Sequence, residues 1–300
     1  MTSQSPRHGL DLSAIVLLAV FWGMNWPAVR IALYEVPPWT LRAIGMGAGA
    51  LFLAALTILR RERLRPESGE WLPILAAGFF SITQFNLLLA FAQLLAPTTR
   101  AVIVTYTMPV WTILFARLLL GERLDGRRWT GLILGVAGLL GLGWPLVQAG
   151  TFSYGLALAL LAGMSWALGT IISKRFPVAT PSMSVVAWQL AGGATVAAIG
   201  AVVFESESPV DWTTLRAETW MALGYHIIFA QALAYMAWYK LLDRLPAGTV
   251  SLSMLLVPAI GVMGSILMLG EHPTFADYAG LLLMTAAASA VHAPRRTRAP

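Results

Sequence analysis

The sequence predicts an all-α integral membrane protein whose ten transmembrane helices form two five-helix repeats of inverted topology. The composition, ten apolar runs and an internal repeat support this fold class. Of the 300 residues, 58% are hydrophobic and only 11% are charged, whereas soluble domains carry about 25% charged residues. A water-soluble chain of this composition would lack enough polar side chains to cover its surface, so we expect the protein in a bilayer.

Ten segments are long and apolar enough to span a membrane, which takes about 20 mostly apolar residues each. They fall at residues 12–34, 38–59, 71–94, 99–120, 129–146, 153–173, 182–204, 219–241, 247–269 and 275–292. Links with turn and charge signals separate them, such as RRERLRPESGE at 60–70 and ESESPVDW at 205–212. The first run exceeds the ~7–15 residues of a signal-peptide core, so we expect a retained helix.

The Lys and Arg residues predict the orientation, because cytoplasmic links carry an excess of positive charge. With the N-terminus in the cytoplasm, 16 of the 20 basic residues fall on the inner side. They are Arg7, Arg60, Arg61, Arg63, Arg65, Arg117, Arg123, Arg127, Arg128, Lys174, Arg175, Lys240, Arg244, Arg295, Arg296 and Arg298. We therefore expect a multi-pass protein with both termini in the cytoplasm.

Two stretches of 24 residues, 109–132 and 258–281, match without gaps at a constant offset of 149. The pairs are Pro109/Pro258, Leu118/Leu267, Leu120/Leu269, Gly121/Gly270, Glu122/Glu271, Gly131/Gly280 and Leu132/Leu281, and Pro97/Pro246 falls on the same offset. We expect a first repeat at 1–147 and a second at 148–300. Because five helices is an odd number, the second repeat enters the membrane inverted, which is typical of transporters with a substrate site between the repeats.

The motifs on which this prediction rests are Trp22, Gly23 and Asn25, the prolines Pro109 and Pro258, and the Gly-Glu pairs Gly121-Glu122 and Gly270-Glu271. In this order and duplication they resemble the drug/metabolite transporter (DMT) superfamily in its ten-helix EamA form. The second half departs from the pattern, with SWALGT (165–170) where the first has FWGMN (21–25). The resemblance implies a transporter of the bacterial inner membrane that exports small metabolites by alternating access, without ATP or a cofactor.

Within this superfamily the chain, with its many Trp and Tyr residues, resembles the YddG-like branch. This resemblance implies export of amino acids, aromatic ones included. We expect uniport, and a protein that functions as a monomer with a small-molecule substrate and the lipid bilayer as its partners. A proton-coupled multidrug or metabolite exporter is the alternative. Nucleic-acid binding is not expected, because the net charge of +6 reflects topology. No cluster of catalytic groups suggests an enzyme, and the absence of cysteine excludes a Cys-based metal or redox site.

The charged residues also constrain the substrate, because ionisable groups inside a membrane are costly and usually functional. All 14 carboxylates fall in links or near helix ends, which argues against a proton-for-cation antiporter. We expect no Lys or Arg at mid-membrane, which disfavours sugar phosphates and nucleotide sugars. Arg30, Arg42 and Arg100 are expected toward the outer side, where they form a gate, attract a carboxylate or extend to the lipid headgroups.

Polar and aromatic side chains well inside the spans are the candidates for the substrate pathway. They are Trp22, Asn25, Gln84, Tyr106, Trp166, Gln231 and Tyr235. An amide that faces lipid would lack a hydrogen-bond partner, so these side chains are expected to point inward. They either line the pathway or bond a neighbouring helix.

Three prolines and one histidine complete the candidates. Pro27 removes a backbone donor and frees a carbonyl in the first helix, and Pro109 and Pro258 are expected to act with it as hinges or gates. His226 lies well inside a span and has the side chain whose ordinary pKa suits proton coupling. A hydrogen-bonded packing role for His226 is the alternative.

Overall fold

The computed structural model describes residues 5–122, 126–148, 153–207, 209–237 and 247–292, and every regular element in these ranges is a helix. The first half contains α1 (Ser5–Gly23), α2 (Asn25–Ala32), α3 (Pro38–Leu59), η1 (Ser68–Glu70), α4 (Trp71–Gly78), η2 (Phe79–Gln84), α5 (Phe85–Leu95), α6 (Thr98–Thr105), α7 (Met108–Leu119) and α8 (Gly126–Gln148). The second contains α9 (Tyr154–Arg175), α10 (Ser182–Phe204), α11 (Ala217–Tyr225), η3 (His226–Leu233), α13 (Ala247–Leu269) and α14 (Phe275–His292).

These elements combine into ten spans, as the sequence predicts. Seven helical stretches of the described chain are long and apolar enough to cross a bilayer, and shorter apolar stretches lie within α8, α13 and α14. The first span is α1 with α2, the third runs from η1 to α5, the fourth is α6 with α7, and the eighth starts with α11 and η3. Pro246, Arg123, Lys240, Arg244 and residues 295–298 lie outside the described residues.

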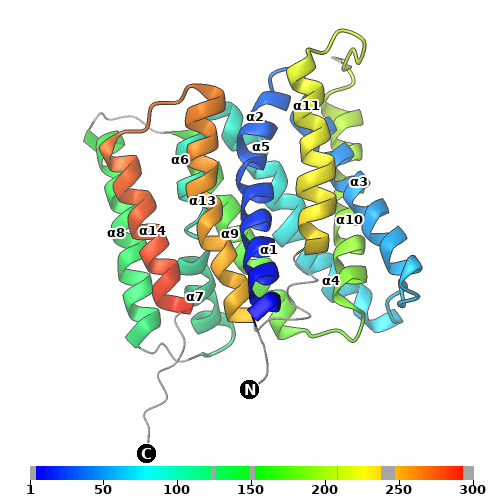
Figure 1. Cartoon of the computed structure of the whole chain (residues 1–300), viewed down its shortest axis with the longest axis horizontal. Coiled ribbons are helices and arrows are strands. Elements are labelled where there is room, and N and C mark those ends of the chain that lie inside the picture. The colour runs from blue at the N-terminus through cyan, green and yellow to red at the C-terminus, as the bar shows by residue number, and fades with distance from the viewer. Residues whose placement is uncertain (1–4, 123–125, 149–152, 208, 238–246, 293–300) are drawn as a thin grey trace, which may run out of the picture.

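Contacts between spans follow a two-fold pattern that relates the two halves. The second spans of the halves, α3 and α10, pack on each other, and so do the fifth spans, α8 and α14 (Figure 1). The first span of each half packs on the third and fourth spans of the other: α9 contacts α5 and α7, while α1 and α2 contact α11 and α13. This exchange of the first spans leaves the first, third and fourth spans of both halves around a common centre.

The duplicated Gly-Glu pairs adopt the same conformation where the fourth and ninth spans end. Gly121 and Gly270 have φ values of 69° and 65°, which glycine adopts without the strain that a Cβ would add. Each turn is closed by one hydrogen bond to the carbonyl six residues back, from the Glu122 amide to Ala116 (3.2 Å) and from the Glu271 amide to Ser265 (3.4 Å). This arrangement is typical of a helix C-terminal cap, and it explains why both residues of the pair recur.

Glutamates from one half bond the helix N-termini of the other. Glu205 accepts hydrogen bonds from the amides of Trp39 and Thr40 at the start of α3, both at 2.8 Å. Glu271 accepts from the amides of Thr98 and Thr99 at the start of α6, at 2.6 and 2.7 Å. Helix N-termini carry unsatisfied N–H groups and partial positive charge, so these carboxylates stabilise the helix ends and join the halves.

Two more glutamates accept hydrogen bonds from the other half near helix starts, one at α11 and one ahead of α10. Glu35 accepts from the Arg216 amide (3.1 Å) and from the Thr219 hydroxyl. Glu70 accepts from the Thr180 hydroxyl at 2.6 Å, just ahead of α10. The hydrogen bonds of three of these glutamates lie on the side of the bundle opposite to Ser5 and His292; the three are Glu35, Glu205 and Glu271. The hydrogen bonds of Glu70 lie on the same side as Ser5 and His292.

Replacing Glu271 with Gln is expected to lower the free energy of unfolding by about 0.5–2 kcal/mol, because the cap of α6 loses its charge. The thermal unfolding midpoint of the purified protein in nanodiscs measures the change. Glu207→Gln is the matched control, since Glu207 is exposed and forms no hydrogen bond within the described residues. Equal midpoints for the two variants would contradict a stabilising role for this carboxylate.

Candidate functional site

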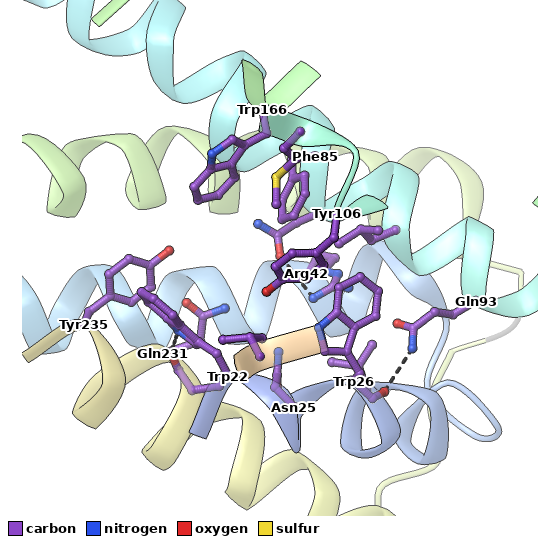
Figure 2. Close-up of a pocket in the computed structure, with 16 residues that line it drawn as sticks. Trp22, Asn25, Trp26, Arg42, Phe85, Gln93, Tyr106, Trp166, Gln231 and Tyr235 are labelled. Atoms are coloured by element: carbon purple, nitrogen blue, oxygen red, sulfur yellow. Dashed lines mark hydrogen bonds between the residues drawn. The ribbon is translucent and has the colours of Figure 1, made fainter. Parts of the chain in front are cut away.

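A cavity of about 110 Å³ lies at the centre of the bundle, between the two halves. Its lining comes from the first, second, third, fourth, sixth, eighth and ninth spans (Figure 2). The lining residues are Trp22, Asn25, Trp26, Val29, Arg42, Phe85, Asn86, Leu89, Gln93, Tyr106, Met108, Trp166, Ala230, Gln231, Tyr235 and Val257. Since one water needs about 10–15 Å³ by this measure, the volume holds several waters or a small polar ligand.

Six of the seven predicted pathway residues line this cavity: Trp22, Asn25, Tyr106, Trp166, Gln231 and Tyr235. Figure 2 shows their side chains directed toward a common space. The seventh, Gln84, is not among the lining residues. Its Oε1 lies 2.8 Å from the Ser165 hydroxyl of α9, whose single proton is shared with the Phe80 carbonyl, so the structure gives Gln84 the helix–helix contact that was the alternative to a pathway role.

Aromatic rings form much of the wall and pack edge to face. The rings of Trp22 and Tyr235 lie 5.7 Å apart with an interplanar angle of 76°, and those of Phe85 and Trp166 lie 4.9 Å apart at 61°. Such pairs are more favourable than their buried area alone implies, by about 0.5–1.5 kcal/mol. The wall is therefore held in place by contacts among its own rings.

Both third spans contain a π-helical segment beside the cavity, η2 in the first half and η3 in the second. Gln84 is the last residue of η2, and Gln231 lies near the end of η3. Side chains of other spans bond the carbonyls in these segments: Ser165 donates to Phe80 at 2.6 Å, and Trp22 donates to Ala230 at 3.2 Å. π-Helical turns occur frequently at functional sites, and these two place their glutamines in different environments.

The three prolines have different local effects. α1 ends at Gly23 and α2 begins at Asn25, so the first span is interrupted just before Pro27. The fourth span is likewise interrupted between Thr105 and Met108, and Pro109 occupies the first turn of α7. Pro258 lies inside the continuous helix α13. The two repeat-related prolines thus start a helix in one half and lie within a helix in the other, and their hinge roles stay a prediction.

The third span bonds α2 just after the interruption. The Gln93 amide donates to the Trp26 carbonyl at 2.9 Å, and Arg30 donates to the Gln93 carbonyl. Gln93 is 1% exposed, so this bond supplies in the protein interior a partner that lipid cannot supply. Arg30 is therefore bonded to the protein rather than extended to the lipid headgroups.

His226 is fully buried beside the cavity but is not part of its lining. Its Nδ1 lies 2.8 Å from the Asn25 Oδ1. An oxygen accepts, so this geometry assigns the proton to Nδ1. Its Nε2 faces Gly45 of α3, where a Cβ on that glycine would come within 2.2 Å of the nitrogen. These contacts favour the packing role for His226, and its link to protons stays an untested prediction.

Arg42 corrects the expectation that no basic residue lies at mid-membrane. It is 2% exposed, lines the cavity and donates to Asn86 Oδ1 at 3.2 Å. Asn86 precedes the helix end at Leu95 by nine residues, which is about 14 Å at 1.5 Å per residue and nearly half of the ~30 Å hydrocarbon core. The expectation failed because sequence position gives the depth of the Cα, whereas a long side chain reaches further.

Several other lining residues are not among the seven pathway candidates, for example Trp26, Phe85, Asn86 and Gln93. Asn86 and Gln93 are seven residues apart and therefore share one face of the third span. That spacing was a usable signal for an inward-facing polar stripe.

The cavity is covered on the side opposite to Ser5 and His292. A cluster of buried apolar side chains from the ends of the first, second, third and eighth spans lies there. It contains Ala28, Val29, Ala32, Leu33, Val36, Leu41, Ala90, Ala222 and Leu223. Beyond it, Arg216 of the seventh link donates to Glu35 at 3.2 Å. The hydrogen bond from the Thr219 hydroxyl, helped by Arg216, lowers the pKa of Glu35, so this carboxylate keeps its charge and its partners at neutral pH.

An inverted duplication around a central, partly polar cavity defines a membrane transporter of small molecules. The comparison with protein families agrees: the EamA-like transporter family matches residues 11–144 and again 153–291. The chain belongs to this family, which places it in the DMT superfamily.

Similar proteins are transporters as well. The uncharacterized transporter YvbV of Bacillus subtilis (strain 168) is 30% identical over 90% of this chain and 87% of its own length. A probable amino-acid metabolite efflux pump of Escherichia coli (strain K12) is 26% identical over 90% of each chain. A crystal structure with 23% sequence identity superposes with a TM-score of 0.63 over 93% of this chain and 96% of its own, which shows the shared fold.

Changing Gly45 to Ala is expected to destabilise the protein by about 1–3 kcal/mol, because the added methyl group meets the ring of His226. Gly47→Ala is the matched control on the same helix, since its Cβ would lie 3.8 Å from the nearest atom, in Ala194. Thermal unfolding of the two variants measures the difference. Equal stability would show that the His226 ring moves away at little cost.

Proposed function

We propose that this protein exports amino acids, aromatic ones included, or similar small metabolites across the bacterial inner membrane by alternating access, as a uniporter. The central cavity is the observation on which this proposal rests. Aromatic rings and neutral amides form most of its wall, and none of the described residues that line it is a carboxylate. Such a wall suits a small ligand with both apolar and hydrogen-bonding groups.

The relatives support the direction and the substrate class. The E. coli protein that is 26% identical carries the name probable amino-acid metabolite efflux pump, and so does a Salmonella typhimurium protein at the same identity. The excess of Lys and Arg in alternate links supports cytoplasmic termini. In that orientation the covered side of the cavity faces outward, so this conformation is closed to the exterior.

The carboxylates bear on proton coupling. Those in the described residues lie in links or in the first two turns of helices, and Asp277, which is 3% exposed, is paired with Arg100 at 2.9 Å. A proton-coupled exporter with a carboxylate at mid-membrane therefore has no support here. Uniport needs only binding and a change of conformation.

Uptake by proteoliposomes tests the proposal directly. Labelled phenylalanine, threonine and methionine are expected to accumulate only until their concentrations inside and outside the liposomes are equal. The initial rate of uptake is expected to be the same with and without a pH gradient. His226→Gln is expected to leave this insensitivity to pH gradients unchanged. Empty liposomes provide the background.

Two results would contradict the proposal. Uptake driven above equilibrium by the proton gradient would replace uniport with coupling and would make His226 the first candidate for the proton. No uptake of any of the three amino acids, together with transport of a bulky cationic dye, would replace the substrate class with that of a multidrug exporter.

The absence of cysteine allows the closed side to be tested with single cysteines. One cysteine replaces Met108, which lines the cavity, and another replaces Tyr34, which is 55% exposed. An impermeant thiol reagent added on the covered side is expected to react about tenfold more slowly with the cysteine at position 108 than with the cysteine at position 34. Adding Glu35→Gln is expected to speed the slow reaction, because the contact with Arg216 loses its charge.

The control for this labelling is Glu207→Gln, which leaves the contact between Glu35 and Arg216 in place. Equal reaction rates for the cysteines at positions 108 and 34 would contradict closure on this side.

A further inference from the structure

Arg42 places a positive charge inside the bilayer, and the described residues give it no negative partner. Among the residues that the structure describes, no carboxylate forms an ion pair with Arg42, and its hydrogen bond goes to the neutral amide of Asn86. Its Nε is buried and has no hydrogen-bond partner within the described ranges. Arginine stays charged in proteins, and a buried charge without a partner is strongly unfavourable. The chain thus retains a costly feature that its own contacts do not explain.

The guanidinium is held in a fixed position on the cavity wall. Asn86 donates through Nδ2 to the Ile82 carbonyl at 2.8 Å, which turns its Oδ1 toward Arg42. Figure 2 shows Arg42 in the middle of the lining residues, between Tyr106 and Asn25. Only the Nη1 group has a hydrogen-bond partner among the described residues, so most of the five N–H groups of the guanidinium have none there.

An unpaired acceptor lies on the same wall. The Oε1 of Gln231 lies near Gly49 of α3 and is buried without a hydrogen-bond partner in the described part of the chain, and Gln231 itself is 6% exposed. The two unpaired groups have opposite requirements, since Arg42 needs an acceptor with negative charge and Gln231 needs a donor. A buried polar atom without a partner is costly, and a ligand that pairs it recovers this cost.

The repeat shows that Arg42 is particular to one half. α3 begins at Pro38 and its counterpart α10 at Ser182, an offset of 144 that also relates Trp22 to Trp166. At this offset Arg42 corresponds to Val186. The fold of the second half forms with an apolar residue at this position, so the charge is not a requirement of the helix pair α3–α10.

We propose that Arg42 binds the carboxylate of the transported molecule, so that the site selects small carboxylates and, among them, amino acids whose ammonium group donates to Gln231. This inference rests on the proposed transport function. A monocarboxylate balances the single charge of Arg42, and bidentate pairing with an arginine is a strong, charge-assisted contact. The aromatic rings Trp22, Tyr106 and Trp166 then face the rest of the substrate.

Ligand-induced stabilisation tests the anchor separately from transport. The purified protein in nanodiscs is heated with phenylalanine, with 3-phenylpropionate, which lacks the ammonium group, and with phenylalaninamide and phenethylamine, which lack the carboxylate. The two carboxylates are expected to raise the unfolding midpoint and the other two are not. In Arg42→Gln the carboxylates are expected to bind about 10- to 100-fold more weakly, the range that loss of a charged hydrogen bond gives.

Two further variants separate a binding role from a structural one. Arg42→Met is expected to raise the unfolding midpoint without ligand, because it removes an uncompensated buried charge, whereas a structural arginine would lower it. Arg30→Gln is the matched control: Arg30 also lies within the first spans, but it bonds the Gln93 carbonyl and does not line the cavity, so carboxylate binding is expected to persist.

The outcomes distinguish this inference from the proposed function. Stabilisation by carboxylates without uptake into proteoliposomes would leave the anchor in place and contradict the transport of these amino acids. The anchor would be overturned, with transport still standing, if phenylalaninamide and phenethylamine inhibited uptake as strongly as phenylalanine does. Unchanged uptake by the Arg42→Gln variant would have the same meaning. If none of the four compounds raised the unfolding midpoint, the anchor would also be overturned.

Discussion

Hydrocarbon offers no hydrogen-bond partner, and the architecture of this protein depends on meeting that constraint within the chain. Helix N-termini at the ends of the spans need acceptors as well, because their N–H groups have no intrahelical acceptor. Here the acceptors come from the other half: Glu205 bonds the start of α3, Glu271 the start of α6 and Glu35 the start of α11. The same bonds that complete single helices therefore hold the two halves together.

The cavity follows from the same constraint at the places where helices are interrupted. The first span is broken before Pro27 and the third spans contain π-helical turns, so these backbones need side-chain partners. Gln93, Trp22 and Ser165 donate to carbonyls of these stretches. Irregular backbone is tolerated in a membrane where it is buried in protein or lines a cavity, and the first span and both third spans meet at the centre of this bundle.

The scaffold is close to two-fold symmetric while the chemistry of the wall is not. Trp22 and its counterpart Trp166 both line the cavity, and the turns at Gly121 and Gly270 are alike. Yet Gln231 faces the cavity whereas Gln84 bonds Ser165, and Arg42 has Val186 as its counterpart. Inverted symmetry suits a rocking motion in which either side opens, and the asymmetric residues are free to specify the substrate.

The sequence by itself determined the ten spans, the duplication and most of the predicted cavity residues, because hydropathy, turn residues and the need of Asn, Gln and Trp for polar partners act locally. Only the tertiary structure decided which amides reach the cavity and how deep Arg42 extends. Gln84 and Gln231 occupy similar positions in the two π-helical segments, and only the contact of Gln84 with Ser165 of α9 separates their roles. The reach of Arg42 depends on Asn86 of another span, a contact that no local pattern encodes because it exists only once the helices pack.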